Sequence, residues 1–148
     1  MAAASNPNQI NVVIAVDVIR ALSDSSLKDN IYLMDNNPFE DGQASTGQGT
    51  DYLTTSCLPG QVIQWTIHAI DLQTPVSIKS IHFINEEDSD VEVVDHNEHE
   101  ARPDLKVWVG VVPNHMNVGQ PYRYKLVLQM GSGENSIMSI DSTALKRI

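Results

Sequence analysis

The chain has 148 residues, which is the usual size of one domain built around one hydrophobic core. It carries 19 acidic and 9 basic residues, a formal net charge of −10. Such a surface repels phosphate backbones and anionic lipids, so we expect no nucleic-acid partner and no membrane partner. Cys57 is the only cysteine, which excludes an intrachain disulfide and fits a reducing cytoplasm.

The first nine residues are small and polar and include one proline, so residues 1–9 are expected to form a disordered leader before a single domain at 10–148. This leader has neither the basic segment nor the apolar run of a secretory signal peptide. No stretch approaches the roughly 18 apolar residues of a membrane-spanning helix. We therefore expect a cytoplasmic protein, with export by another route left open.

The N-terminal third predicts two strands and one short helix. Residues 10–16 (INVVIAV) form an apolar, β-branched run typical of a buried strand. Residues 17–23 are expected to form one or two helical turns with Asp17 as the N-cap. A second short strand follows at 31–34, and residues 35–49 are rich in Asn, Pro, Asp and Gly and predict a loop.

Three strand candidates lie in the middle of the chain, at 52–58, 61–70 and 76–84, with a Pro-Gly turn at 59–60. The second alternates strictly, with Ile63, Trp65, Ile67 and Ala69 on one face, as expected of a half-buried strand. In the third the apolar phase changes near residues 79–80, which predicts a β-bulge.

The C-terminal third adds strand candidates at 105–112 and 122–130, and a return strand at 136–141 that would close a hairpin. Short strands at about ten-residue spacing, without a long helix to cover a parallel sheet, indicate an all-β fold. We expect a two-layer antiparallel β-sandwich of about eight strands with at most one short helix.

Several segments are similar to the AidA/PixA (inclusion-body) family of small bacterial proteins, and more to its AidA branch. The similarity spans nearly the whole chain and includes residues 10–23, 27–36, 47–53, 59–81, 103–113, 119–131 and 139–145. It implies a β-sandwich that often self-associates. It also implies expression controlled by autoinducer (quorum-sensing) signalling or growth phase in host-associated bacteria, and it implies no enzymatic activity.

The acidic stretch at 85–100 matches nothing in that family. Asp88, Asp90 and Glu92 alternate within it, so an extended chain would place their carboxylates on one side as half of a calcium site. The glycine and the twelve-residue spacing of an EF-hand are missing. A solvated loop whose charges prevent strand pairing is the interpretation we favour, with calcium kept open as a cofactor.

Other candidate sites are weaker. His96 and His99 with Glu98 and Glu100 suit adventitious surface metal binding better than a closed zinc site. The cysteine–histidine–methionine grouping of a blue-copper site, a nucleophile elbow and a phosphate loop are all missing from the sequence. We therefore expect no enzyme. Four aspartates follow apolar runs and either cap strand ends or converge at one rim: Asp17, Asp35, Asp71 and Asp141.

The many predicted strands, the missing catalytic groupings and the family resemblance together predict a non-enzymatic protein. The resemblance implies that it self-associates, so a homo-oligomer is the expected assembly. A protein or glycan partner stays open. The alternatives are a calcium-dependent carbohydrate-binding module and a storage protein that forms inclusion bodies. The low methionine count, five, is unlike a methionine-rich storage role.

Overall fold

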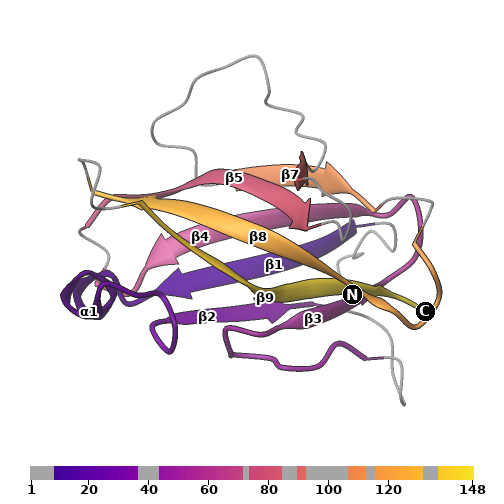
Figure 1. Ribbon diagram of the computed structural model, residues 1–148, viewed down its shortest axis with the longest axis horizontal. Coiled ribbons are helices and arrows are strands. Elements are labelled where there is room, and N and C mark those ends of the chain that lie inside the picture. Colours follow the sequence, from indigo (N-terminus) through magenta and orange to yellow (C-terminus); the bar gives the residue numbers. More distant parts are fainter. Residues whose placement is uncertain are drawn as a thin grey trace, which may run out of the picture.

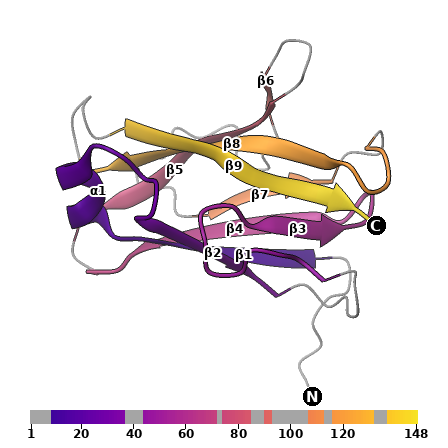
Figure 2. The same cartoon turned by 60° about the horizontal axis from the view of Figure 1, so that its bottom comes forward.

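The computed structural model describes residues 9–36, 44–71, 74–84, 90–92, 107–112, 116–131 and 137–148, and for 90–92 only the backbone. These residues form nine strands and one helix. The strands lie in two stacked sheets, with the helix at one end (Figure 1, Figure 2). The expected all-β sandwich with at most one short helix is confirmed.

One layer is a four-stranded sheet in the order β2-β1-β4-β7. Its strands are β1 (Gln9–Val16), β2 (Ile31–Asp35), β4 (Val62–Ala69) and β7 (Val107–Val111). β2 and β7 run antiparallel to their neighbours, whereas β1 and β4 run parallel.

The other layer is a five-stranded sheet in the order β3-β9-β8-β5-β6. Its strands are β3 (Thr54–Cys57), β5 (Val76–Ile84), β6 (Asp90–Glu92), β8 (Pro121–Met130) and β9 (Ile137–Arg147). All pairings are antiparallel except that of β3 with β9.

The prediction of a purely antiparallel sandwich is therefore wrong at two pairings. Period-2 alternation reports which face of a strand is buried, and it carries no information on the direction of the neighbouring strand. The bulge expected in the third central strand is confirmed, because the β5–β8 register shifts between Ile78 and Ser80.

The core lies between the two sheets and is made by the inward phase of each long strand. β4 buries Ile63, Trp65, Ile67 and Ala69, as its alternation predicts. The facing strand β8 buries Tyr124, Leu126, Leu128 and Met130. Close packing of these aliphatic and aromatic side chains is the main favourable term that holds the layers together.

The helix α1 (Val18–Asp24) follows directly on β1. The Asp17 side chain accepts a hydrogen bond of 3.1 Å from the backbone N–H of Arg20 and so satisfies a free donor of the first turn. The helix ends at Ser25, which adopts a left-handed conformation with φ of 55°. The predicted N-cap is confirmed.

Candidate interaction surface

The outer face of the four-stranded sheet carries no Asp, Glu, Lys or Arg among its strand residues. We call this surface the uncharged face. Val13 and Met34 are register partners at its centre, 37% and 41% exposed. By alternation and burial the face consists of Gln9, Asn11, Val13, Ala15, Tyr32, Met34, Val62, Gln64, Thr66, His68, Val107, Val109 and Val111.

The outer face of the five-stranded sheet is different. Its described strand residues include Arg123, Lys125, Asp141 and Lys146, and Lys79 is exposed at the bulge. The chain as a whole has a net charge of −10, so the absence of charged side chains is a feature of this one sheet face.

Two of the four sheet edges are blocked by the chain itself. Along the free side of β2, the N–H of Leu33 donates to the Thr50 carbonyl at 3.0 Å, and the Gly49 N–H donates to the Leu33 carbonyl at 2.7 Å. Along β3, Thr46 and Thr54 exchange two backbone hydrogen bonds of 2.9 and 3.0 Å. These contacts occupy the groups that would otherwise bind another strand.

The third edge, β6, is a strand of only three residues, two of them acidic in the sequence. Short and charged edge strands resist pairing with a further strand. The fourth edge, β7, has the sequence VWVGV and no charge. Within the described part of the chain, every backbone hydrogen bond of β7 goes to β4, so β7 is the edge with neither device.

The backbone geometry of β7 can be read from its pairing with β4. Val112, just beyond the strand, directs both its N–H and its carbonyl toward β4, at 2.9 Å from the Gln61 carbonyl oxygen and 3.0 Å from the Gly60 nitrogen. In an antiparallel ladder this direction alternates along the strand. The N–H and carbonyl groups of Val107, Val109 and Val111 therefore point to the free edge.

The polar groups of the interior are sealed from solvent. Tyr124 and Cys57 both have 0% exposure. Burial raises the pKa of the Cys57 thiol to about 12, and burial likewise raises the pKa of Tyr124 to about 12. Both groups are therefore neutral near pH 7 and out of reach of a substrate.

The proposed calcium ligands are not tested by the structure. Asp88 lies outside the described residues, and Asp90 and Glu92 belong to β6, whose backbone pairs with β5 but whose side chains are not described. The candidate cluster of His96, Glu98, His99 and Glu100 also lies outside them. Among the side chains that are described, no three of His, Cys, Asp or Glu come together as a metal site.

The four strand-end aspartates do not converge at one rim. β1 and β4 are parallel with Val16 opposite Ala69, so Asp17 and Asp71 share one end of the sandwich. Asp35 pairs with Val12 and lies toward the other end. Capping is confirmed for Asp17 and Asp71, the second of which accepts hydrogen bonds from the backbone N–H and the hydroxyl of Thr74.

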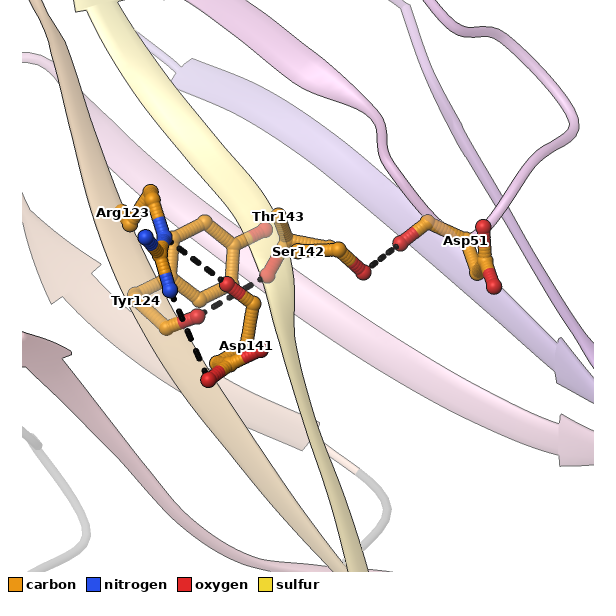
Figure 3. A network of polar contacts seen from close by, with 6 residues as sticks. All are labelled: Asp51, Arg123, Tyr124, Asp141, Ser142 and Thr143. Atoms are coloured by element: carbon orange, nitrogen blue, oxygen red, sulfur yellow. Dashed lines mark hydrogen bonds and ion pairs between the residues drawn. The ribbon is translucent and has the colours of Figure 1, made fainter. Parts of the chain in front are cut away.

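Asp141 does not end a strand at all, because β9 continues to Arg147. Between the pairs Tyr124–Thr143 and Leu126–Ile140, β9 has two residues where β8 has one, so Asp141 and Ser142 form a bulge. There the Arg123 guanidinium contacts the Asp141 carboxylate at 3.4 Å, and the Ser142 hydroxyl donates to the Asp51 carbonyl (Figure 3).

Both tryptophans are core residues, with Trp65 1% and Trp108 4% exposed. The sequence analysis did not identify residues 107–111 as an edge strand without protecting charges. The residues on both faces of this strand are uncharged, whereas the solvent-facing side of an edge strand ordinarily carries polar residues.

No helix in the described part of the chain has both the length and the apolar character needed to cross a bilayer.

Comparison with known proteins gives a family and a fold. A family model described as a domain of unknown function (DUF8788) matches residues 8–136. The search of curated proteins found no match. Among solved structures, the fold is similar to that of an inclusion body protein (PixA) from Burkholderia cenocepacia J2315, with a TM-score of 0.57 and 6% sequence identity over 99% of this chain and 96% of that chain.

Proposed function

The chain belongs to the DUF8788 family of domains of unknown function, and we propose that it is a non-enzymatic protein whose activity is to associate with copies of itself. The observation that carries the proposal is the uncharged face. Two copies with a net charge of −10 each repel one another, and an uncharged sheet face is where they approach at the lowest electrostatic cost.

The size of this face suits a weak contact. Two strands about 26 Å long and two about 17 Å long, spaced about 4.8 Å apart, span about 400 Å². Two such faces total about 800 Å², which is below the roughly 1,000 Å² of a stable specific interface, so the face contributes to association without carrying a tight contact alone. Five of its 13 residues are valines and one is a methionine, and burial of these side chains on association would supply favourable free energy.

The similarity in fold to an inclusion body protein supports the same class of role. We further propose kinship with the AidA branch, expression under autoinducer control and a cytoplasmic site of action that serves host-associated life. Transcript levels measured with and without added autoinducer test the regulatory part, and unchanged levels would contradict it.

The test of self-association is sedimentation velocity over a wide range of protein concentration at low and high salt. We expect the weight-average mass to rise with concentration. We also expect it to rise with salt, because added salt screens the repulsion between the acidic copies. A monomer under every condition would overturn the proposal.

The calcium-dependent carbohydrate-binding alternative is supported by the alternating acidic residues Asp88, Asp90 and Glu92. A thermal-unfolding scan with calcium and with chelator separates the two. A ligand that binds only the native state raises the melting temperature, so a calcium-dependent rise favours the alternative and leads to glycan screening. The self-association proposal involves no metal cofactor and therefore predicts equal melting temperatures with calcium and with chelator.

A further inference from the structure

We propose that two copies of this chain join edge to edge through β7, in antiparallel pairing about a two-fold axis that passes close to Val109. The inference rests on the proposed self-association and names the contact that carries it. The partner is a second copy of the chain, and the contact consists of main-chain hydrogen bonds between the two β7 strands.

The first argument is that β7 is the edge left open among the residues that the structure describes. β2 and β3 are bonded along their free sides by residues 45–50 of the same chain, and β6 has only three residues. Proteins protect edge strands with charges, prolines or covering segments, and β7 (VWVGV) contains no charge and no proline. Among described residues, nothing but β4 bonds to its backbone.

The second argument is geometric self-complementarity. The N–H and carbonyl groups of Val107, Val109 and Val111 point to the free edge, by the alternation established from Val112. A two-fold axis at Val109 places Val109 opposite its own copy and Val107 opposite Val111 of the second copy. Each of these is a hydrogen-bonded pair with valine facing valine, a cross-strand combination that favours sheet pairing.

The third argument is electrostatic. Edge pairing continues the four-stranded sheet into the second copy, so that the residues nearest the contact belong to the uncharged face of each copy. Apart from Asp35 at the end of β2, which accepts a hydrogen bond from the buried Thr55, the described charged side chains of sheet strands, such as Arg123 and Asp141, lie on the other layer. β7 is about 17 Å long at about 3.3 Å per residue, which makes this a short contact, so we expect a weak dimer.

The deciding experiment compares Val109→Pro with Val13→Lys by sedimentation velocity. Proline at 109 removes an N–H that points away from β4, so it spares the native ladder, and proline is tolerated on edge strands for this reason. Both copies lose a donor, so we expect the dimer dissociation constant to rise about tenfold or more. Lysine at Val13 places a charge at the centre of the uncharged face and leaves the β7 edge intact. It should change the dimer dissociation constant by less than about threefold.

A second pair of variants keeps the test decisive if Val109→Pro unfolds. Val109→Lys and Val109→Glu should each be monomeric, since like charges then meet across the axis, and an equimolar mixture should restore the dimer. Val109→Thr, which keeps both the N–H and a β-branched side chain, is the matched control and should dimerise like the parent.

The outcomes separate this inference from the proposed function. If Val13→Lys abolishes association and Val109→Pro does not, the copies meet face to face, which overturns the β7 contact and leaves self-association standing. Association that none of the substitutions weakens overturns the β7 contact as well. A parent protein that stays monomeric overturns both.

Discussion

The indole N–H of Trp65 donates a hydrogen bond of 3.2 Å to the phenolic oxygen of Tyr124 across the interior of the sandwich. Trp65 lies on β4 and Tyr124 on β8, so the bond joins the two layers. Their rings also meet edge to face, with centroids 5.6 Å apart. Such a contact fixes the position of one sheet over the other more narrowly than aliphatic packing does.

Replacement of Tyr124 by phenylalanine should reveal this bond. The ring contact is kept, but the buried Trp65 N–H loses its acceptor, so we expect the free energy of unfolding to fall by about 1–3 kcal/mol. Urea unfolding followed by tryptophan fluorescence measures it. Tyr52→Phe is the control, because Tyr52 is 58% exposed and should change stability by less than about 0.5 kcal/mol. Equal effects of the two substitutions would contradict this account.

The Cys57 thiol should be protected from modification in the native protein. It has 0% exposure, and burial raises its pKa to about 12, so the reactive thiolate is scarce at neutral pH. We expect dithionitrobenzoate to react about a thousandfold more slowly with the folded than with the unfolded chain. Because the chain has one cysteine, the absorbance change reports this site alone. Rapid labelling without denaturant would mean that the β3–β9 pairing opens easily.

Stability should decline in alkali. The pKa of Cys57 rises from 9.0 to about 12 on folding, and that of Tyr124 rises from 10.0 to about 12. Both groups then hold their protons more tightly in the folded chain, so their contribution is intact below about pH 9 and is lost as pH rises toward about 12. Each group ionised only in the unfolded chain lowers stability by about 1.4 kcal/mol per pH unit.

The Cys57→Ala variant separates the two groups. The thiol begins to ionise in the unfolded chain one pH unit before the phenol does, so the variant should lose the decline between about pH 9 and 10. Above about pH 10 it should keep only the decline due to Tyr124, about half as steep as that of the parent. Urea midpoints at pH values of about 8, 9.5 and 10.5 measure this. A parent protein whose midpoint is level up to about pH 11 would refute the assignment.

The sequence predicted what depends on neighbours along the chain. Alternation identified the buried phase of β4, the broken phase of residues 76–84 located the β5 bulge, and Asp17 was found as a helix cap. Each of these is set by contacts within a few residues, or by the burial of one face, and both leave a periodic trace in the sequence.

Pairing partners could not be predicted in the same way. The parallel contacts of β1 with β4 and of β3 with β9 join segments far apart in the chain, and no local pattern encodes them. The edge position of β7 depends on these pairings, because an edge strand is defined only once the strand order is set. The Asp141 bulge was hidden for a related reason: two adjacent polar residues are typical of a strand end as well as of a bulge.

Asp17 and Asp141 follow apolar runs in the same way in the sequence, yet their replacement by alanine should have different effects. Asp17 accepts the N-cap hydrogen bond from Arg20, and its loss should cost about 1 kcal/mol and lower the melting temperature by about 2–4 °C. Asp141 forms an ion pair with Arg123 in which the two side chains are 63% and 56% exposed, so Asp141→Ala should cost at most about 0.5 kcal/mol. The two variants remove the same charge, which makes each the control for the other. Calorimetric melting temperatures that fall equally would show that net charge, rather than the helix cap, sets the response.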